Sequence, residues 1–225
     1  MREEVEMITY NDVKNNKTVR TYIEHADRSL LALGYTEHSY AHVGLVAHRA
    51  EYILSTLGYS DREVELVKIA AFMHDIGNVV NRKDHSQSGA VMAFRILDTM
   101  GMDADELAGI VTAIGNHDEG DGEAVSPLAA ALIIADKTDV RRTRVRNQDI
   151  TNFDIHDKVN YSVISSDLLI DKEKGEIQLR LVIDTQISPV VNYFEIFLKR
   201  MLMCRKAASK LGLNFKLIVN EQELM

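Results

Sequence analysis

The chain has 225 residues, of which 46% are hydrophobic and 27% are charged. This composition is typical of a globular protein with one or two domains, and it excludes a mainly disordered chain. The 26 Lys and Arg residues against 34 Asp and Glu residues give a net charge of −8, which disfavours nucleic acid polymers as partners.

Three further features of the chain predict a cytoplasmic protein without membrane contact. Cys204 is the single cysteine, so no internal disulfide can form, as is usual in a reducing compartment. The N-terminus is charged from its second residue, unlike a signal peptide. The longest apolar runs have about eight residues, whereas a membrane helix needs about 20.

Helical periodicity dominates the chain up to about residue 146. Ser126-Pro127 and Ser188-Pro189 each predict an N-cap serine followed by proline in the first turn of a helix. Asp61 and Asp84 are also predicted to cap helices. The predicted helices lie near residues 18–33, 38–57, 61–75, 86–100, 104–115 and 127–145, and the glycines expected to end helices are Gly34, Gly58, Gly77, Gly101 and Gly120.

The pattern changes after about residue 150. Residues 177–183 alternate as a half-buried strand does, and residues 161–170 are the expected hairpin partner. A long helix over 189–211 and a short strand over 215–219 follow. The predicted fold is therefore mainly α, a helical domain over residues 1–150 with a small α+β appendage over 151–225.

The predicted helix 189–211 has an apolar stripe that a small hairpin cannot cover alone. The appendage is therefore expected either to cap the helical domain or to form a homodimer contact.

Two acidic positions lie in strongly apolar surroundings. His74-Asp75 ends one apolar helix, and Asp136 follows eight consecutive apolar residues. A buried carboxylate needs a cation or a basic partner. The alternatives are a capping histidine with an exposed Asp75, and an ion pair between Asp136 and Lys137 or the arginines that follow.

Three more histidines are candidate metal ligands. His42 lies on an amphipathic helix, where a single histidine is more often an ordinary core residue. His85 begins a predicted helix and His117 ends one, positions that equally suit a solvent-facing cap. Together with the two acidic positions they supply imidazole and carboxylate groups, which suit Mn, Fe, Co, Ni or Zn better than Ca.

In chain order, these residues form a set that resembles the HD-domain superfamily of metal-dependent phosphohydrolases. The flanking sequences Phe-Met-His-Asp-Ile-Gly and Ile-Ala-Asp-Lys are typical of that family. The additional histidines, His85 and His117, resemble its branch with two metals. The resemblance covers about residues 20–146 and implies the HD-domain helical bundle.

The resemblance also implies which residues bind metal. One ion would take His42, His74, Asp75 and Asp136. A second would take Asp75 as a bridge with His85 and His117, and Asp118 is a further candidate. Because Asn78 replaces a lysine common in the cyclic-dinucleotide branch, and a Gly-Tyr-Pro motif of that branch is absent from the sequence, cyclic di-GMP is disfavoured as the substrate.

A phosphorylated substrate needs local positive charge. Lys137 and Arg141 follow Asp136 closely, and Arg82 and Lys83 precede His85, so these four are the candidate phosphate contacts. The alternative for the basic run after Asp136 is a solvated helix face.

The function that these features predict is a metal-dependent phosphohydrolase that cleaves a small nucleotide or another phosphoester through a metal-activated hydroxide. Asp75 is a catalytic candidate as the bridging ligand, and Asp118 and Glu119 are candidates by position for the general acid. The alternative is a noncatalytic metal-containing module that senses a nucleotide.

Overall fold

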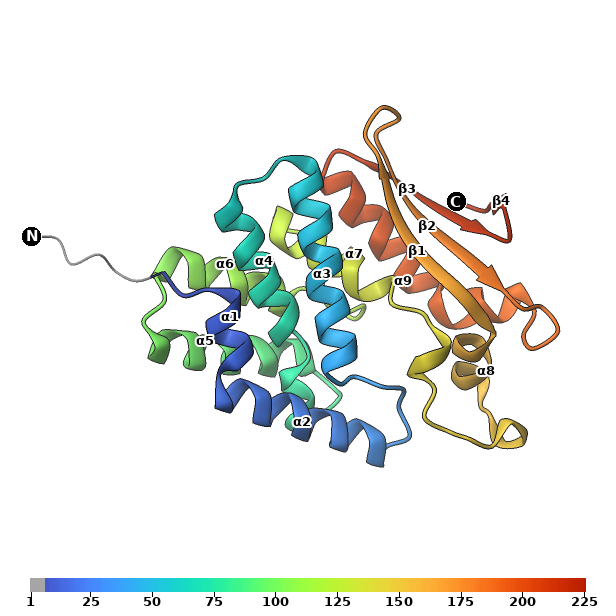
Figure 1. Cartoon of the computed structure of the whole chain (residues 1–225), viewed down its shortest axis with the longest axis horizontal. Helices are drawn as coiled ribbons and strands as arrows, with labels where there is room; N and C mark the ends of the chain where they lie inside the picture. The colour runs from blue at the N-terminus through green and yellow to red at the C-terminus, as the bar shows by residue number, and fades with distance from the viewer. Residues whose placement is uncertain (1–6) are drawn as a thin grey trace, which may run out of the picture.

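The computed structural model describes residues 7–225, so the charged N-terminal residues 1–6 lie outside the described part. Helices fill one side of the molecule and a small sheet the other, as Figure 1 shows. The predicted fold class, mainly α with a small α+β appendage, is confirmed. No helix within residues 7–225 is long and apolar enough to cross a membrane.

The helices of the first part largely follow the predicted ranges. They are α1 (Tyr10–Asn15), α2 (Lys17–Ala32), α3 (Tyr40–Leu57), α4 (Asp61–Met73), the 3-10 helix η1 (Ile76–Val79), α5 (His85–Met100), α6 (Ala104–Gly115) and α7 (Pro127–Lys137). Of these, α1 was not predicted from the sequence. Its N-cap, Thr9, forms a capping box with Asp12.

The second part contains the sheet, two short 3-10 helices and the helices α8 and α9. Its elements are η2 (Arg142–Arg144), η3 (Ile150–Asn152), α8 (Ile155–Ser162), β1 (Val163–Asp171), β2 (Glu176–Ile183), α9 (Val190–Lys210), β3 (Asn214–Val219) and β4 (Gln222–Glu223). The sheet order is β1-β2-β3-β4. The β1–β2 hairpin is antiparallel as predicted, and β3 lies parallel to β2 because α9 returns the chain across the sheet.

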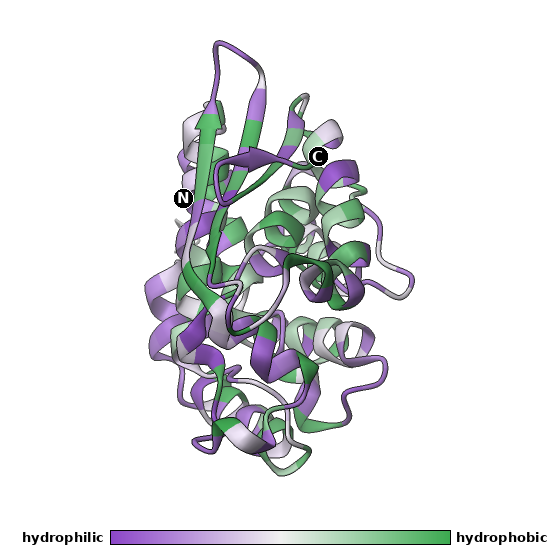
Figure 2. Ribbon diagram, turned by 90° about the vertical axis from the view of Figure 1, so that its right-hand side faces the viewer, coloured by the Kyte–Doolittle hydropathy of each residue, from purple (hydrophilic) through white to green (hydrophobic). Residues whose placement is uncertain are grey.

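The apolar stripe of α9 is buried within the same chain. Phe197, Met201 and Ala208 are all buried, and α9 packs on both α7 and β3. Figure 2 shows hydrophobic residues where these elements meet, whereas the tip of the β1–β2 hairpin is hydrophilic. This packing covers the stripe without a second copy, and the homodimer alternative stays a prediction.

A buried arginine ties the helical part to the sheet. Arg49 of α3 donates hydrogen bonds to the carbonyl oxygens of Thr138, at 2.6 Å, and Ser166, at 2.7 Å. Charged groups are costly to bury unless all their donors are used, so these bonds fix the end of α7 against β1.

The helix α7 ends at Lys137, and the prediction that it extends to residue 145 was wrong. The Thr138 hydroxyl donates back to the carbonyl of Ile134, and Asp139 turns inward. Arg142 and Arg144 then donate to the carbonyl oxygens of Tyr161 and Glu37. The basic segment after Lys137 is therefore held by hydrogen bonds to other parts of the chain. It forms neither the predicted continuation of α7 nor a solvated helix face.

Of the four predicted N-caps, one is confirmed. Two others differ by one residue from the N-cap in the structure, and the last makes no capping hydrogen bond through its side chain. Ser126 caps α7 as predicted, but Ser60 rather than Asp61 caps α4, and Pro189 rather than Ser188 precedes α9. Asp84 precedes α5 in a left-handed conformation without a capping hydrogen bond.

The predicted glycine caps are confirmed at three of the five positions. Gly34, Gly58 and Gly101 have positive φ angles after α2, α3 and α5, which is the backbone conformation that favours glycine. Neither Gly77 nor Gly120 has a positive φ. Gly77 serves a different purpose, because it lies where η1 packs directly on the first turn of α5.

We predict that Gly77→Ala strongly destabilises the protein. The added Cβ would overlap with the carbonyl oxygen of His85 and the amide nitrogen of Gly89, both of which are backbone atoms that cannot rotate away. Urea denaturation should show a loss of about 3 kcal/mol or more in the free energy of unfolding.

The matched control is Gly44→Ala in α3, where no atom lies within 4 Å of the added Cβ. That change should stabilise the protein by up to about 1 kcal/mol, because alanine is the better helix former. Equal stability of the two variants would contradict the close-packing role of Gly77.

Candidate metal centre

The six predicted metal ligands converge from five helices. His42 lies on α3, His74 and Asp75 end α4, and His85 begins α5. His117 directly follows α6, and Asp136 lies in the last turn of α7. All of them are buried except Asp136, which is partly buried. The alternatives of a solvent-facing cap at His85 or His117 and of an exposed Asp75 are therefore wrong.

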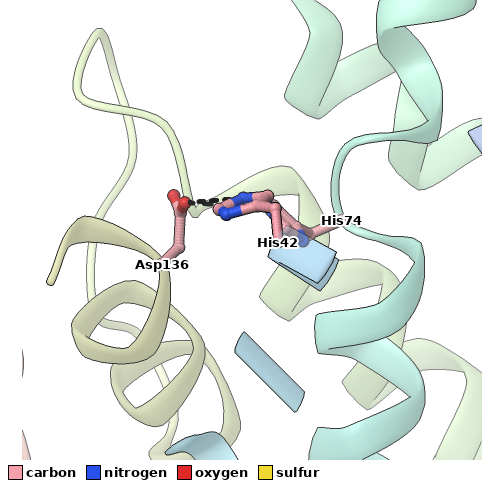
Figure 3. A group of neighbouring side chains, drawn as sticks. All are labelled: His42, His74 and Asp136. Carbon is pink, nitrogen blue, oxygen red and sulfur yellow. Dashed lines mark hydrogen bonds and ion pairs between the residues drawn. The ribbon is translucent and has the colours of Figure 1, made fainter. Parts of the chain in front are cut away.

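The first group of ligand atoms surrounds Asp136. The Nε2 atoms of His42 and His74 lie 3.3 Å apart, and they lie 3.4 and 3.7 Å from Oδ1 of Asp136. Figure 3 shows the two imidazoles and this carboxylate turned toward one another. Oδ2 of Asp75 lies 3.5 Å from the His42 nitrogen and 3.3 Å from that of His74.

The second group lies on the other side of Asp75. Nε2 of His85 is 3.2 Å from Nε2 of His117 and 3.4 Å from Oδ1 of Asp75. Oδ1 of Asp118 is 3.9 Å from the same His85 nitrogen. Oδ2 of Asp75 therefore faces His42 and His74, whereas Oδ1 faces His85, which in turn contacts His117.

These distances fit the geometry of divalent-metal sites. Ligand atoms that bind one cation tetrahedrally at about 2.1 Å lie about 3.4 Å from one another. The ligand atoms of His42, His74 and Asp136 all lie within 4.8 Å of each other, as do those of His74, Asp75 and His117. The donor set therefore fits a divalent cation.

Each of the four histidines is oriented by a hydrogen bond at its other ring nitrogen. Nδ1 of His74, His85 and His117 lies 2.7, 3.0 and 2.6 Å from a backbone carbonyl oxygen, and Nδ1 of His42 lies 2.7 Å from Oδ2 of Asp139. A carbonyl only accepts, so Nδ1 carries the hydrogen. This arrangement turns the Nε2 atoms toward the shared space, as the hydrogen-bond partners of metal-binding histidines do in metal sites.

Asp139 was not predicted from the sequence. It is fully buried, and Arg141 donates to its Oδ1 at 2.7 Å. Burial opposes ionisation, but the nearby Arg144 guanidinium and the His42 imidazole hold the pKa of Asp139 well below its usual range. Asp139 is therefore ionised, and its carboxylate can accept the hydrogen bond from Nδ1 of His42.

The carboxylates also control the protonation of the histidines. Burial lowers the pKa of His74, but the Asp75 and Asp136 carboxylates outweigh it and raise the pKa to about 10. A cation must therefore compete with a proton for the Nε2 atom of His74.

Lys137, a predicted phosphate contact, lies behind the centre. Its side chain is only 3% exposed, and its Nζ lies 2.8 Å from Oδ2 of Asp136 and 3.0 Å from Oε2 of Glu119. The ion pair considered as an alternative for Asp136 is therefore present, but Oδ1 of the same carboxylate faces His42 and His74. This placement favours a supporting role for Lys137 over contact with substrate.

Glu119, a candidate general acid, is held by two basic groups. It accepts from Lys137 and, at 2.6 Å, from Nε of Arg200 on α9. Burial opposes ionisation, but these two charges lower the pKa of Glu119. A carboxylate in this setting favours an anchoring role over proton donation, whereas Asp118 is more exposed, with its Oδ1 4.0 Å from Lys137.

The remaining predicted phosphate contacts differ in their position. Arg141 is occupied by Asp139 and by Glu37, and Lys83 is exposed without a contact to the ligand groups. Arg82 lies beside the centre, with its Nη1 3.3 Å from Nε2 of His85 and 3.9 Å from Oδ1 of Asp75.

A cavity of about 340 Å³ opens beside Arg82. His38 lines it from the helical part, Arg144 from η2 and Arg200 from α9. The His38 ring lies 5.3 Å from the ring of His42, so the cavity adjoins the first ligand group. Neither His38 nor Arg200 was predicted as a site residue, because nothing in their local sequence distinguishes them.

Part of the chain matches a known protein family. The HD domain family model matches residues 39–141, which include all six predicted ligands. The uncharacterized protein MJ1020 of Methanocaldococcus jannaschii is 26% identical, in a match that covers 84% of this chain and 86% of that protein. The crystal structure of a predicted HD superfamily hydrolase from an uncultured Thermotogales bacterium has 25% identity and a TM-score of 0.45, covering 56% of this chain and 68% of that one.

The site thus belongs to a helical domain that gathers histidines and aspartates from separate helices into one buried cluster. The family match confirms, over residues 39–141, the resemblance to the HD-domain superfamily that was predicted from the sequence.

We predict that Asp139→Asn weakens metal binding by about 10- to 100-fold, because it removes the charge that orients His42. Calorimetric titration of the chelator-treated protein with Mn²⁺ measures the affinity. Arg141→Met is the control, since it removes a partner of Asp139 but leaves the contact with His42. Equal affinities in the two variants would contradict the role of Asp139.

We also predict that metal binding releases protons and strengthens as the pH rises. With a pKa of about 10, His74 is protonated at pH 7.5 in the apoprotein, so binding through its Nε2 displaces about one proton per ion at that group. The affinity should increase about tenfold per pH unit until the pH approaches 10. Calorimetry in two buffers of different ionisation enthalpy counts the protons, and a pH-independent affinity between pH 7 and 9 would refute this competition.

Proposed function

We propose that this protein is a metal-dependent phosphohydrolase that acts on a small nucleotide or another small phosphoester. The observation that carries the proposal is the position of Asp75, whose Oδ2 lies near His42 and His74 and whose Oδ1 lies near His85. A carboxylate that can bridge two cations is the central feature of two-metal hydrolytic sites.

The residues divide into two ligand groups. His42, His74, Asp75 and Asp136 would hold one cation, and Asp75, His85 and His117 a second, with Asp118 close by. Divalent Mn, Fe, Co, Ni or Zn suits these mixed ligands. When bound, such ions supply Lewis acidity, which activates water and neutralises charge on a phosphoryl group.

The protein's own side chains contribute binding and orientation. Arg82 is partly exposed on the cavity wall next to Asp75 and His85, where its guanidinium can donate to phosphoryl oxygens. Asp118 is the candidate for proton transfer, because no contact within residues 7–225 places a cationic group closer to its carboxylate than 3.9 Å.

We expect the protein loaded with Mn²⁺ or Ni²⁺ to hydrolyse at least one member of a panel of p-nitrophenyl phosphate, bis-p-nitrophenyl phosphate and nucleotides. Asp75→Ala should lower kcat by about 1,000-fold or more, because both ligand groups lose a shared member. The matched control is His48→Ala, which removes another α3 histidine whose side chain is 77% exposed.

Two outcomes would overturn the proposal. One is turnover in Asp75→Ala equal to that of the unchanged protein. The other is full metal occupancy and nucleotide binding without hydrolysis of any member of the panel, which would support the noncatalytic sensing module instead.

A further inference from the structure

The cavity beside the metal centre is built by both parts of the chain. Arg82 and His38 line it from the helical part, Arg144 of η2 lies between the two parts in the sequence, and Asn160 of α8 and Arg200 of α9 line it from the appendage. The HD domain match ends at residue 141, so the α8 and α9 walls lie outside the matched segment.

Arg200 is fixed in place by its neighbours but keeps hydrogen-bonding capacity. Its Nε donates to Oε1 of Glu119 at 2.6 Å, and its guanidinium carbon lies 4.7 Å from the centre of the Phe197 ring. Within residues 7–225, its two terminal nitrogens have no protein acceptor at hydrogen-bond distance. The side chain is 24% exposed and lines the cavity, so these donors are accessible to a ligand.

A continuous row of charges connects Arg200 to the metal centre. Asp136 pairs with Lys137, Lys137 pairs with Glu119, and Glu119 pairs with Arg200. A fixed guanidinium loses less conformational freedom when it binds an anion than a flexible surface arginine does. Arg200 is therefore preorganised for a ligand that reaches the metal centre.

The cavity lining also contains negative charge. Asp154 and Asp157 line the cavity together with Asn160 of α8. Carboxylates and an amide can accept hydrogen bonds from hydroxyl or amino groups, but carboxylates repel a second phosphate. The volume of about 340 Å³ is near the lower limit of about 300–1,000 Å³ for small-molecule sites, which favours a compact ligand.

We propose that the appendage completes the substrate site, with Arg200 binding the phosphate opposite Arg82 and with α8 accepting the uncharged remainder of a compact phosphomonoester. This inference rests on the proposed function and narrows its substrate class to a monophosphate of a hydroxyl-rich group, such as a sugar or a nucleoside. It places a phosphate-binding residue outside the segment that matches the HD domain.

The first experiment measures binding of inorganic phosphate to the Mn²⁺-loaded protein by calorimetry, which needs no turnover. Arg200→Met should weaken phosphate binding by about tenfold or more, because a bidentate charged contact is lost. Arg200→Lys, which keeps the charge but not the planar fork, should have intermediate affinity. Metal content measured in parallel should be unchanged in both variants.

The control is Arg205→Met, an exposed arginine of the same helix that does not line this cavity. It should bind phosphate like the unchanged protein. Unchanged phosphate affinity in both Arg200 variants, with full metal content, would overturn the proposal. If Arg200→Met does not fold, unchanged affinity in Arg200→Lys overturns it alone.

The second experiment compares AMP with ADP and ATP as competitors for phosphate binding. AMP should compete best, and Asp157→Asn should reduce its advantage over ATP, because one repelling carboxylate is removed. Tighter binding of ATP than AMP in the unchanged protein would overturn the substrate class. Phosphate binding that depends on Arg200 without any turnover would contradict the proposed hydrolysis alone, and turnover with Arg200-independent binding would contradict this inference alone.

Discussion

The carboxylate of Asp75 is the constraint on which the rest of the site depends. It lies buried just after α4, with Oδ2 facing the imidazoles of His42 and His74 and Oδ1 facing that of His85. The Asn78 side chain also donates to its Oδ1 at 2.8 Å, which fixes the orientation of the carboxylate. A charge buried at this depth is costly without partners, so the surrounding helices must deliver those partners accurately.

Close packing of the backbone makes that delivery possible. η1 follows Asp75 immediately, and the absence of a side chain at Gly77 lets it contact the start of α5. His85 therefore reaches Asp75 from the first residue of α5. Local contacts orient two further ligands, because carbonyl oxygens in the last turns of α4 and α6, those of Ala71 and Ile114, accept from the Nδ1 atoms of His74 and His117. The carbonyls left without partners at helix ends thus orient the ligands.

Most helices and the buried acidic residues were predicted because both leave local signals in the sequence, whereas the division of the ligands into two groups followed from the family resemblance. Buried charge is indicated at two positions, Asp136 after eight apolar residues and His74-Asp75 at the end of an apolar helix. Only a cation or a basic partner can stabilise such a charge. Asp139 gave no such signal, since its role depends on His42, 97 positions away in the chain. The same non-local cause ended α7 early, because Arg141 donates to the Asp139 carboxylate, and Arg142 and Arg144 donate to the carbonyl oxygens of Tyr161 and Glu37, rather than continuing a helix.

Positive charge gathers locally in this acidic chain, and Lys137 contributes to its arrangement only indirectly. The net charge is −8, yet three arginines line one cavity beside the metal centre. Lys137 does not add to them, because its ammonium group is used between Asp136 and Glu119. Glu119 in turn positions Arg200, so a buried lysine on α7 sets the place of an arginine on α9. Since Coulomb interactions between exposed charges are screened within about 10 Å in 0.1 M salt, this local arrangement rather than the overall charge determines what the cavity attracts.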